Sequence, residues 1–207
     1  MKGLVVQIRN VLMYLHRRFI VHRDIKPSNV LCERGEDGSV QVCLADFGIA
    51  THANKGDDIS KRCGTAGYIA PEILEEEWTE SFSSPLATPQ VAAKQVLKTD
   101  IFSFGVLVYE LALGVNPFVG PTLRETFISN ARGVINAEEN PRLSVELQDL
   151  LNCFTARNPH DRCSIFDGAD RRWFQADLRA LGFAGVDEDL RGYSVAWEVF
   201  EEESRRR

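Results

Sequence analysis

The chain has 207 residues, a net charge of −6 and an isoelectric point of about 5.3, and 44% of its residues are hydrophobic. This length allows one domain with a sizeable core, and the composition is that of a globular protein. The acidic balance argues against nucleic acid as the main partner and gives no reason to expect an anionic membrane surface. The most apolar run, 101–113, is shorter than the about 20 residues that span a bilayer, so we predict no membrane segment.

Five cysteines occur, and none lies in a C-x-x-C pair: Cys32, Cys43, Cys63, Cys153 and Cys163. The odd number favours free thiols in a reducing compartment, and residues 1–15 do not have the pattern of a signal peptide. We therefore expect an intracellular protein, cytoplasmic or nuclear. Cys32 and Cys43 flank a turn and are placed to face each other, although two small core residues are the favoured interpretation.

The first predicted element is an amphipathic helix over 3–17, because its apolar residues recur at three- and four-residue spacing. A polar loop over 22–29 follows. Two short strands are predicted at 30–32 and 40–44, joined by the Gly- and Asp-rich turn E-R-G-E-D-G-S. Residues 51–66 have no hydrophobic period and predict a loop.

The rest of the chain predicts helices only. A short helix follows A-P-E at 70–72, and 75–96, which is acidic and then rich in Ser, Pro, Ala and Gln, is interpreted as a surface insertion. An apolar helix is predicted over 101–113, with Thr99 or Asp100 as its N-cap and Gly114 at its end. Further helices are predicted over 143–154 and 165–181. The expected fold class is mainly α with a small β-hairpin beside the polar loop.

The polar loop carries residues suited to phosphoryl transfer. A hairpin that begins at Asn29 and ends at Asp46 returns the chain to its starting point, so these two side chains converge with Asp24 nearby. Carboxylate and amide oxygens suit Mg²⁺, a hard cation that also binds substrate phosphates. Lys26 adds a positive charge at the same point. Positioning and charge neutralisation do most of the work in phosphoryl transfer, so we predict that reaction.

Three motifs in this region resemble those of eukaryotic-type protein kinases: H-R-D-I-K-P-S-N at 22–29, D-F-G at 46–48 and A-P-E at 70–72. Three longer stretches extend the similarity in the same order: G-T-A-G-Y-I-A-P-E at 64–72, T-D-I-F-S-F-G-V-L-V-Y-E-L at 99–111 and N-P-H-D-R at 158–162. The resemblance covers residues 1–175. It implies the large C-terminal lobe of the α+β kinase fold, here truncated, with 176–207 as an acidic tail.

The resemblance implies a role for each residue of the site. Asp24 would accept or orient the proton of the substrate hydroxyl, and Lys26 would neutralise charge on the transferred phosphoryl group. Asn29 and Asp46 would hold Mg²⁺, and Leu31 would lie under the adenine ring of ATP.

Lys26 and Thr65 together resemble the serine/threonine branch, since tyrosine kinases usually have an alanine- or arginine-bearing loop at 22–29 instead. Thr65 would hydrogen-bond to Asp24 and Lys26. The implied reaction transfers the γ-phosphate of ATP to a Ser or Thr hydroxyl of a protein substrate. An upstream kinase is a further implied partner.

Other residues are implied to support the site. Glu72 and Arg162 would form a buried ion pair that locks the docking segment, which we define as residues 64–72. Asp100 would be a plain helix N-cap or, as in the family, would hold the backbone of the polar loop at 22–29. Three residues are predicted to be structural: His22, Phe47 and Gly48. Arg23 would be free to grip a phosphate, with two candidate acceptors: Thr51 and Ser60.

The sequence contains no G-x-G-x-x-G loop and no V-A-I-K lysine, which cover the nucleotide in kinases. The expectation is a fragment whose small lobe is encoded upstream. The alternative is a truncated product that acts as a catalytically silent interaction or scaffold module. Activity of the large lobe alone is not expected, since half a nucleotide cleft positions the phosphates poorly.

Overall fold

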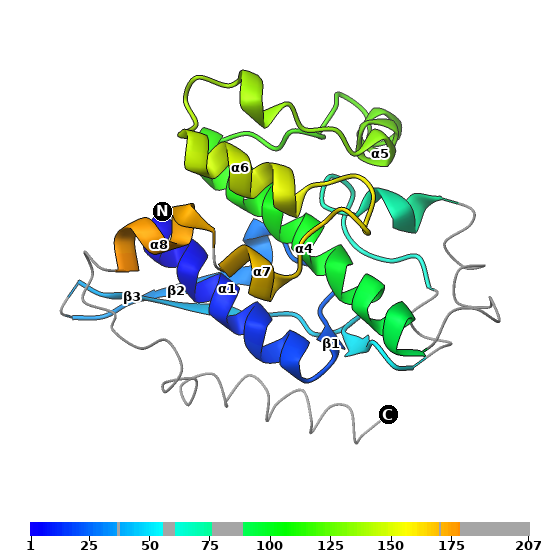
Figure 1. Cartoon of the computed structure of the whole chain (residues 1–207), viewed down its shortest axis with the longest axis horizontal. Coiled ribbons are helices and arrows are strands. Elements are labelled where there is room, and N and C mark those ends of the chain that lie inside the picture. Colours follow the sequence, from blue (N-terminus) through cyan, green and yellow to red (C-terminus); the bar gives the residue numbers. More distant parts are fainter. Residues whose placement is uncertain (37, 56–60, 76–88, 170, 179–207) are drawn as a thin grey trace.

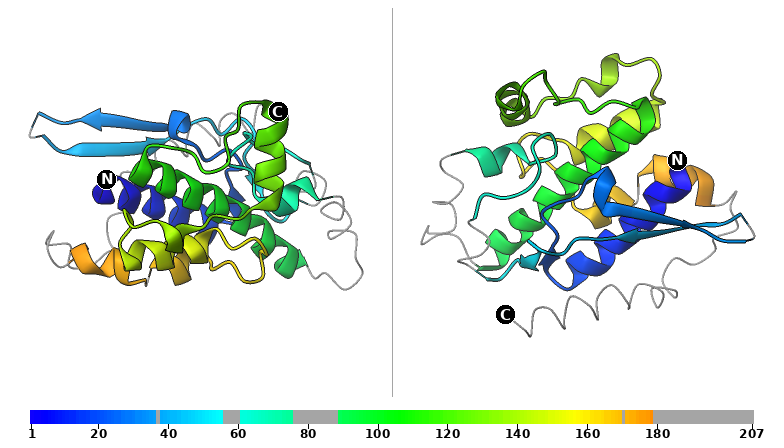
Figure 2. Two further views of the ribbon diagram at one scale, coloured as in Figure 1. Left: turned by 90° about the horizontal axis from the view of Figure 1, so that it is seen from above. Right: turned by 180° about the vertical axis from the view of Figure 1, so that it is seen from behind.

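The computed structural model describes residues 1–36, 38–55, 61–75, 89–169 and 171–178, and these are rich in helix (Figure 1). Helix α1 (Lys2–Arg17) lies in the middle. A β-hairpin lies on one side of it, and α6 (Val145–Phe154), α7 (Ile165–Ala169) and α8 (Arg172–Leu178) lie on the other, as the left view in Figure 2 shows. The long helix α4 (Pro89–Leu113) packs against α6. The predicted fold class, mainly α with a small hairpin, is confirmed.

Helix α1 forms because its apolar residues fall on one face. Val5, Ile8, Leu12 and Leu15 are buried in the main core, where strand β3 (Val40–Leu44) and α7 pack against the helix. Spacings of three and four residues place these side chains one above another on the helix. The helix predicted over 3–17 is therefore confirmed.

The hairpin consists of β2 (Val30–Arg34) and β3 (Val40–Leu44), paired antiparallel from Val30 opposite Leu44 to Arg34 opposite Val40. Alternate residues of β3 face opposite sides, so Val42 and Leu44 are buried against α1 while Cys43 is exposed. The predicted hairpin is confirmed. The interpretation of its two cysteines as core residues is wrong, because both Cys32 and Cys43 are exposed. The alternative that they face each other is also wrong, because Cys32 lies opposite Val42.

A second, two-stranded sheet was not predicted. Strand β1 (Ile20–Val21) pairs antiparallel with β4 (Thr51–His52), within a stretch that the sequence predicts to be a loop. Strands of two residues are too short to show a hydrophobic period. This sheet joins the start of the polar loop at 22–29 to the chain that leaves the hairpin.

Helix α4 begins at Pro89, well before the predicted start at 101. Thr99 and Asp100 therefore lie inside the helix, and the N-cap prediction for them is wrong. The surface-insertion interpretation is also wrong for 89–96, because Ala93 and Val96 are buried in a second core cluster together with Phe102. Ala, Gln and Lys, which dominate this stretch, are strong helix formers. The remainder of the proposed insertion, 76–88, lies outside the described residues.

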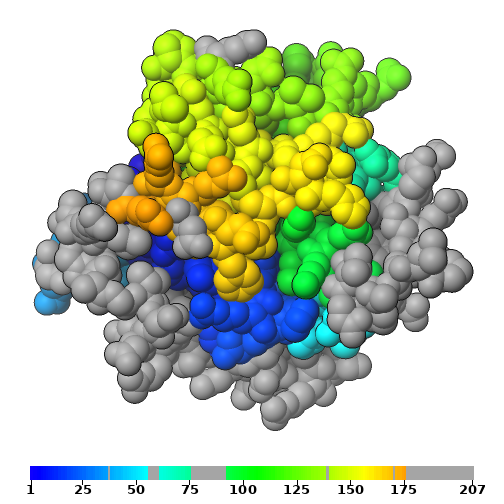
Figure 3. All heavy atoms as spheres, viewed as in Figure 1, coloured from blue at the N-terminus to red at the C-terminus, as the bar shows by residue number. Residues whose placement is uncertain are grey.

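The helices after α4 close the core. Helix α5 (Leu123–Arg132) and the 3-10 turn η3 (Ala137–Glu139) precede α6, which begins after its capping residue Ser144. The predicted helix over 143–154 is confirmed. The single helix predicted over 165–181 is wrong, because the chain forms two short helices, α7 and α8. Figure 3 shows the segments from α6 to α7, in yellow and orange, covering the middle of one face between α1 and α4.

The acidic tail was predicted over 176–207, and from residue 179 onward it lies outside the described residues.

The prediction that all thiols are free is wrong, because Cys153 and Cys163 form a disulfide. In the part of the chain that the structure describes, no helix combines the length and the apolar character needed to cross a bilayer.

The packing of α4 on α6 predicts opposite effects for two Gly→Ala substitutions. A Cβ on Gly105 in α4 would lie 2.5 Å from Thr155 Cγ2, so Gly105→Ala should lower the free energy of unfolding by about 1–2 kcal/mol despite the better helix propensity of Ala. A Cβ on Gly3 meets nothing within 4 Å, so Gly3→Ala should be neutral or stabilise by up to about 1 kcal/mol. Urea unfolding measures both values. Equal effects of the two substitutions would show that the close approach of α4 and α6 is wrong.

Candidate active site

The polar loop at 22–29 is held by one buried carboxylate, that of Asp100 on α4. Its Oδ2 accepts the backbone N–H of His22 at 2.8 Å, and its Oδ1 accepts the backbone N–H of Arg23 at 2.8 Å. Asp100 is fully buried, and hydrogen bonds to a charged group in such a place are strong. The backbone of Arg23 has φ +69, a left-handed conformation that costs free energy in a non-glycine residue. The two bonds from Asp100 stabilise the loop in that conformation.

Sequence reasoning missed the third partner of this carboxylate. His16 Nε2 lies 3.1 Å from Asp100 Oδ2, and the His16 side chain is almost fully buried. Its position in the helical pattern of α1 was the available signal, because it lies four residues after Leu12 on the buried face.

Asp24, Lys26 and Thr65 form a closed triangle of polar contacts. Lys26 Nζ lies 2.7 Å from Asp24 Oδ2 and donates to Thr65 Oγ1 at 2.8 Å, and Thr65 Oγ1 donates to Asp24 Oδ1 at 2.6 Å. The triangle joins the polar loop to the docking segment, more than 35 residues later in the chain. The contacts expected from Thr65 to both residues are thus present.

Asn29 fixes Asp24 from the other side. Its Nδ2 donates to the backbone oxygen of Asp24 at 2.8 Å and to Asp24 Oδ2 at 3.0 Å. Burial alone would raise the pKa of Asp24, but hydrogen bonds from Lys26, Thr65 and Asn29 and the charge of Lys26 outweigh it and lower that pKa below its usual value. Asp24 is therefore a carboxylate at neutral pH.

The hairpin brings Asp46 to the same end of the sheet as Asn29. Ala45 N–H donates to the backbone oxygen of Asn29 at 2.8 Å, one position beyond the last pair of the ladder, and Asp46 follows directly. Asp46 is exposed, has φ +63, and accepts the N–H of Gly48 at 3.2 Å. A Cβ on Gly48 would lie 3.0 Å from Asp46 Oδ1, so glycine leaves room for this carboxylate.

His22 and Phe47 pack together behind the loop. Their ring centroids are 4.8 Å apart in an edge-to-face arrangement, and His22 is fully buried. Burial lowers the pKa of His22 against the opposing effect of nearby carboxylates, so the ring is neutral at pH 7. Its Nδ1 accepts the N–H of Asp24 at 3.3 Å, and Nε2 donates to the oxygen of Ala45 at 3.1 Å. The ring therefore joins the two ends of the site.

The structure does not support the predicted phosphate contact between Arg23 and Thr51. Arg23 donates from Nε to the backbone oxygen of Ile49, so the prediction of a free guanidinium is wrong. Thr51 is buried in β4, and adding a phosphate there requires the β1–β4 pair to open, which speaks against it as an acceptor in this conformation. Ser60 lies outside the described residues. Leu31 lies on the hairpin with 56% of its surface exposed.

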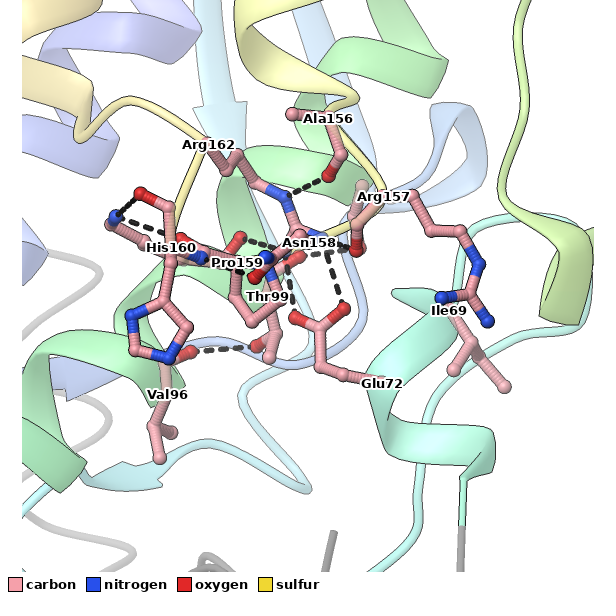
Figure 4. Close-up of polar contacts among 12 residues, drawn as sticks. Ile69, Glu72, Val96, Thr99, Ala156, Arg157, Asn158, Pro159, His160 and Arg162 are labelled. Carbon is pink, nitrogen blue, oxygen red and sulfur yellow. Dashed lines mark hydrogen bonds and ion pairs between the residues drawn. The ribbon is translucent and has the colours of Figure 1, made fainter. Parts of the chain in front are cut away.

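Glu72 and Arg162 form a buried, two-point ion pair (Figure 4). Nη1 and Nη2 of Arg162 donate to Oε1 and Oε2 of Glu72 at 2.7 and 2.9 Å. The same guanidinium donates to the backbone oxygens of Lys98 and Ala156 at 2.8 and 2.9 Å. Burial and the neighbouring Arg162 lower the pKa of Lys98. The buried Glu72 carboxylate and Arg162 guanidinium therefore compensate each other's charge, as buried ionised groups require.

Two asparagines that the sequence analysis overlooked hold the middle of the docking segment. Asn130 on α5 is fully buried, accepts the N–H of Gly67 at 2.8 Å and donates to the oxygen of Ile69 at 2.6 Å. Asn116 reaches the oxygen of Gly67 at 3.4 Å, at the edge of hydrogen-bonding distance. No motif marks these residues, so only the folded structure reveals them.

Tyr68, between these contacts, donates to the Glu110 carboxylate on α4. Burial and this bond raise the pKa of Tyr68 to about 12, so the phenol stays protonated and continues to donate. Its backbone oxygen accepts the hydroxyl of Ser103 at 2.7 Å. Side chain and backbone of Tyr68 are thus both fixed to α4.

The protein kinase domain family model matches residues 1–174, which include every motif described above. The chain belongs to the protein kinase family. Curated kinases with similar sequences include a probable serine/threonine-protein kinase 2 of Plasmodium falciparum, 32% identical over 184 residues, and a death-associated protein kinase related protein of Drosophila melanogaster, 34% identical over 175 residues.

Solved structures agree with this assignment. The kinase domain of Rad53 with SCD2, crystallised with AMPPNP, matches 84% of this chain with a TM-score of 0.63 and 25% identity. The alignment covers 58% of that chain. The chain described here spans only 32% and 23% of the lengths of the Plasmodium and Drosophila proteins, while those alignments cover 87% and 83% of the chain.

The role of Asp100 predicts a large difference between two Asp→Asn substitutions. Asp100→Asn places an amide N–H₂ against a backbone N–H in a buried site and should lower the free energy of unfolding by about 2–4 kcal/mol. Asp46→Asn changes an exposed carboxylate, and asparagine tolerates positive φ, so the change should stay within about 0.5 kcal/mol. Chemical denaturation of the two variants measures this difference. Similar losses in both would contradict the anchoring role of Asp100.

Proposed function

We propose that this kinase chain carries the phosphotransfer centre of a serine/threonine protein kinase, with Asp24 at its middle. The observation that carries the proposal is the closed triangle of Asp24, Lys26 and Thr65, which fixes a carboxylate, a cation and a hydroxyl at one point. Such fixed charges suit a reaction in which positioning and electrostatic stabilisation lower the barrier.

Asp24 is proposed to orient the hydroxyl of a protein Ser or Thr. A carboxylate has about four acceptor positions, two on each oxygen. Lys26 and Asn29 occupy Oδ2 and Thr65 occupies one position of Oδ1, which leaves Oδ1 to accept the substrate O–H. The lowered pKa of Asp24 suits an acceptor that aligns the hydroxyl and takes its proton late, rather than a strong base.

Asn29 and Asp46 fit a magnesium site by the chemistry of their atoms. Asn29 turns its Nδ2 toward Asp24, so the amide oxygen points elsewhere, and Asp46 presents an exposed carboxylate beyond the neighbouring strand. Hard oxygen donors of this kind are the ligands Mg²⁺ takes when it also binds phosphates. Magnesium and ATP, when bound, would supply charge neutralisation and the phosphoryl group.

Lys26 and Leu31 are proposed to contact ATP. Lys26 is half-buried and already within the Asp24 triangle, so its ammonium group is held where negative charge would develop on a phosphoryl group. Leu31 offers an exposed apolar surface on the hairpin, on which an adenine ring would pack. The Thr65 hydroxyl supports the serine/threonine assignment because it completes the Asp24 triangle.

The docking segment is proposed to receive the protein substrate. Its ends are held by Thr65 and by the Glu72–Arg162 pair, and its middle by Asn130. A segment fixed at three points presents a defined surface next to Asp24. We also propose residues 1–175 as the extent of the kinase domain, close to the limits of the family match.

The test compares phosphotransfer by the parent and by Asp24→Asn, using labelled ATP and a mixture of Ser-, Thr- and Tyr-containing peptides. Loss of a positioned general base should reduce transfer by about 10²–10⁴-fold. Asp149→Asn is the matched control, because Asp149 is exposed on α6 and pairs only at the surface with Arg171, so its activity should equal that of the parent. Label should appear on Ser and Thr, not on Tyr.

The assay uses both the 207-residue chain and the protein captured from its natural source with an antibody to 182–200, because nucleotide-covering motifs are absent from these 207 residues. Equal transfer by the parent and Asp24→Asn would reject the role of Asp24. No transfer from either preparation would favour the catalytically silent interaction module.

A further inference from the structure

The loop between α6 and α7, residues 155–162, connects several parts of the molecule. Besides the contacts of Arg162 with Glu72 and Lys98, Arg157 donates to Glu75 Oε1 at 2.8 Å and to the backbone oxygen of Arg132 at the end of α5 at 3.2 Å. Lys98 Nζ in turn donates to the oxygen of Pro159 at 2.7 Å. Figure 4 shows Glu72 and the backbone of Ala156 and Arg157 around the Arg162 guanidinium, while the Arg157 side chain points away from it. The loop therefore links α4, α5 and the docking segment.

A cysteine pair closes this loop at its base. Cys153 is in the last turn of α6, and Cys163 directly follows Arg162, with their Cα atoms 5.6 Å apart. The backbone N–H of Cys163 also donates to the oxygen of Cys153 at 3.3 Å. The disulfide therefore encloses every residue of the loop. The enclosed residues include Arg162, which bonds to Glu72 in the docking segment, and Arg157, which bonds to Glu75 just after that segment.

We propose that Cys153 and Cys163 are a redox modification site that exchanges with low-molecular-weight disulfides of the glutathione class. In the oxidised state, the pair holds the loop, and with it Arg162, against the docking segment. This inference concerns the linkage between loop and docking segment, and it does not depend on phosphotransfer.

The exchange balances as two displacement steps. Cys163 is half-buried and Cys153 is nearly fully buried, so the external disulfide meets Cys163 first. The Cys163 thiolate attacks one sulfur of the external disulfide, forms a mixed disulfide and releases one thiolate. The Cys153 thiolate then attacks Cys163 Sγ and releases the second. The protein loses two protons and two electrons, which leave on two small thiols, and excess small thiol reverses both steps.

The enclosed loop explains why oxidation would affect the docking segment. A cross-link restricts the alternative conformations of the residues that it encloses. The guanidinium of Arg162 draws two of its acceptors, the oxygens of Ala156 and Arg157, from this same loop, so restricting the loop also restricts Arg162. Glu72, which bonds to both terminal nitrogens of Arg162, is then held as well.

The first measurement counts free thiols in the full chain after equilibration with oxidised or reduced glutathione. Alkylation followed by peptide mass mapping should find a Cys153–Cys163 cross-link in the oxidised buffer, with Cys32, Cys43 and Cys63 either alkylated or carrying one glutathione but not cross-linked to each other. All five thiols should react in the reduced buffer after unfolding. Five reactive thiols in the oxidised buffer, or a cross-link that joins other cysteines, would overturn the proposal.

The second measurement is hydrogen exchange of backbone amides in the same two buffers. Exchange over 154–162 and over 69–75 should be at least about 5-fold slower in the oxidised chain, which corresponds to about 1 kcal/mol of added local stability. Cys153→Ser should abolish this redox dependence. Cys63→Ser is the matched control, because Cys63 lies just before the docking segment but outside the pair, so the dependence should remain.

A third variant separates the two parts of the inference. In Glu72→Gln, the redox effect should remain over 154–162 and decrease over 69–75, because the link through Arg162 is weakened. If this variant does not fold, Arg157→Gln tests the link between loop and docking segment through the Arg157–Glu75 ion pair instead. The Arg157 side chain is about half exposed, so this variant should fold. A redox effect over 69–75 that persists in Cys153→Ser would show that another thiol controls the docking segment and would overturn the proposal.

Discussion

The buried carboxylate of Asp100 is the constraint on which the site depends. A loop with a positive φ at Arg23 is not a conformation that the chain adopts unaided. Two backbone N–H groups point at one carboxylate, and that carboxylate belongs to a rigid helix in the core. Because the helix is fixed by α6 and by the second core cluster, the position of Asp24 is fixed relative to the whole molecule.

Helix α4 also positions the docking segment. Lys98 and Ser103 lie on either side of Asp100 in this helix. The backbone oxygen of Lys98 accepts a hydrogen bond from Arg162, and the Ser103 hydroxyl donates one to the backbone oxygen of Tyr68. One stretch of α4 therefore positions both the loop that carries Asp24 and the segment that carries Thr65. The Asp24–Lys26–Thr65 triangle forms where these two segments meet, and this explains how side chains distant in sequence share one point.

The sequence predicted well those features that depend on local patterns. The periodicity of α1 and the Gly-rich turn between β2 and β3 are local signals, and the H-R-D, D-F-G and A-P-E motifs indicated the residues that converge. The start of α4 was misplaced because Ala- and Gln-rich sequence is weakly hydrophobic, although Ala93 and Val96 are buried. Tertiary packing, not the apolar run, sets where that helix begins.

Distant contacts that no sequence motif marks could not be predicted, unlike the Glu72–Arg162 pair and the contacts of Thr65. Nothing in the sequence near Asn130 indicates that it bonds to Gly67 and Ile69, and nothing near Cys153 indicates Cys163 as its partner. Thr51 was a reasonable phosphate acceptor in a predicted loop, but the β1–β4 pair buries it. In each case a long-range contact, not local propensity, determines the environment of the side chain.

The most direct test of the proposed site is the change in melting temperature when Mg²⁺ and ATP are added together. A ligand that binds only the folded state raises the melting temperature, and its stabilisation grows with the logarithm of the ligand concentration relative to Kd. We expect a rise that needs both components, that disappears with EDTA and that is lost in Asp46→Asn, although this variant should melt like the parent without ligand. A rise of equal size in Asp46→Asn and the parent, or no rise in either the 207-residue chain or the protein from its natural source, would contradict a magnesium–nucleotide site at Asp46.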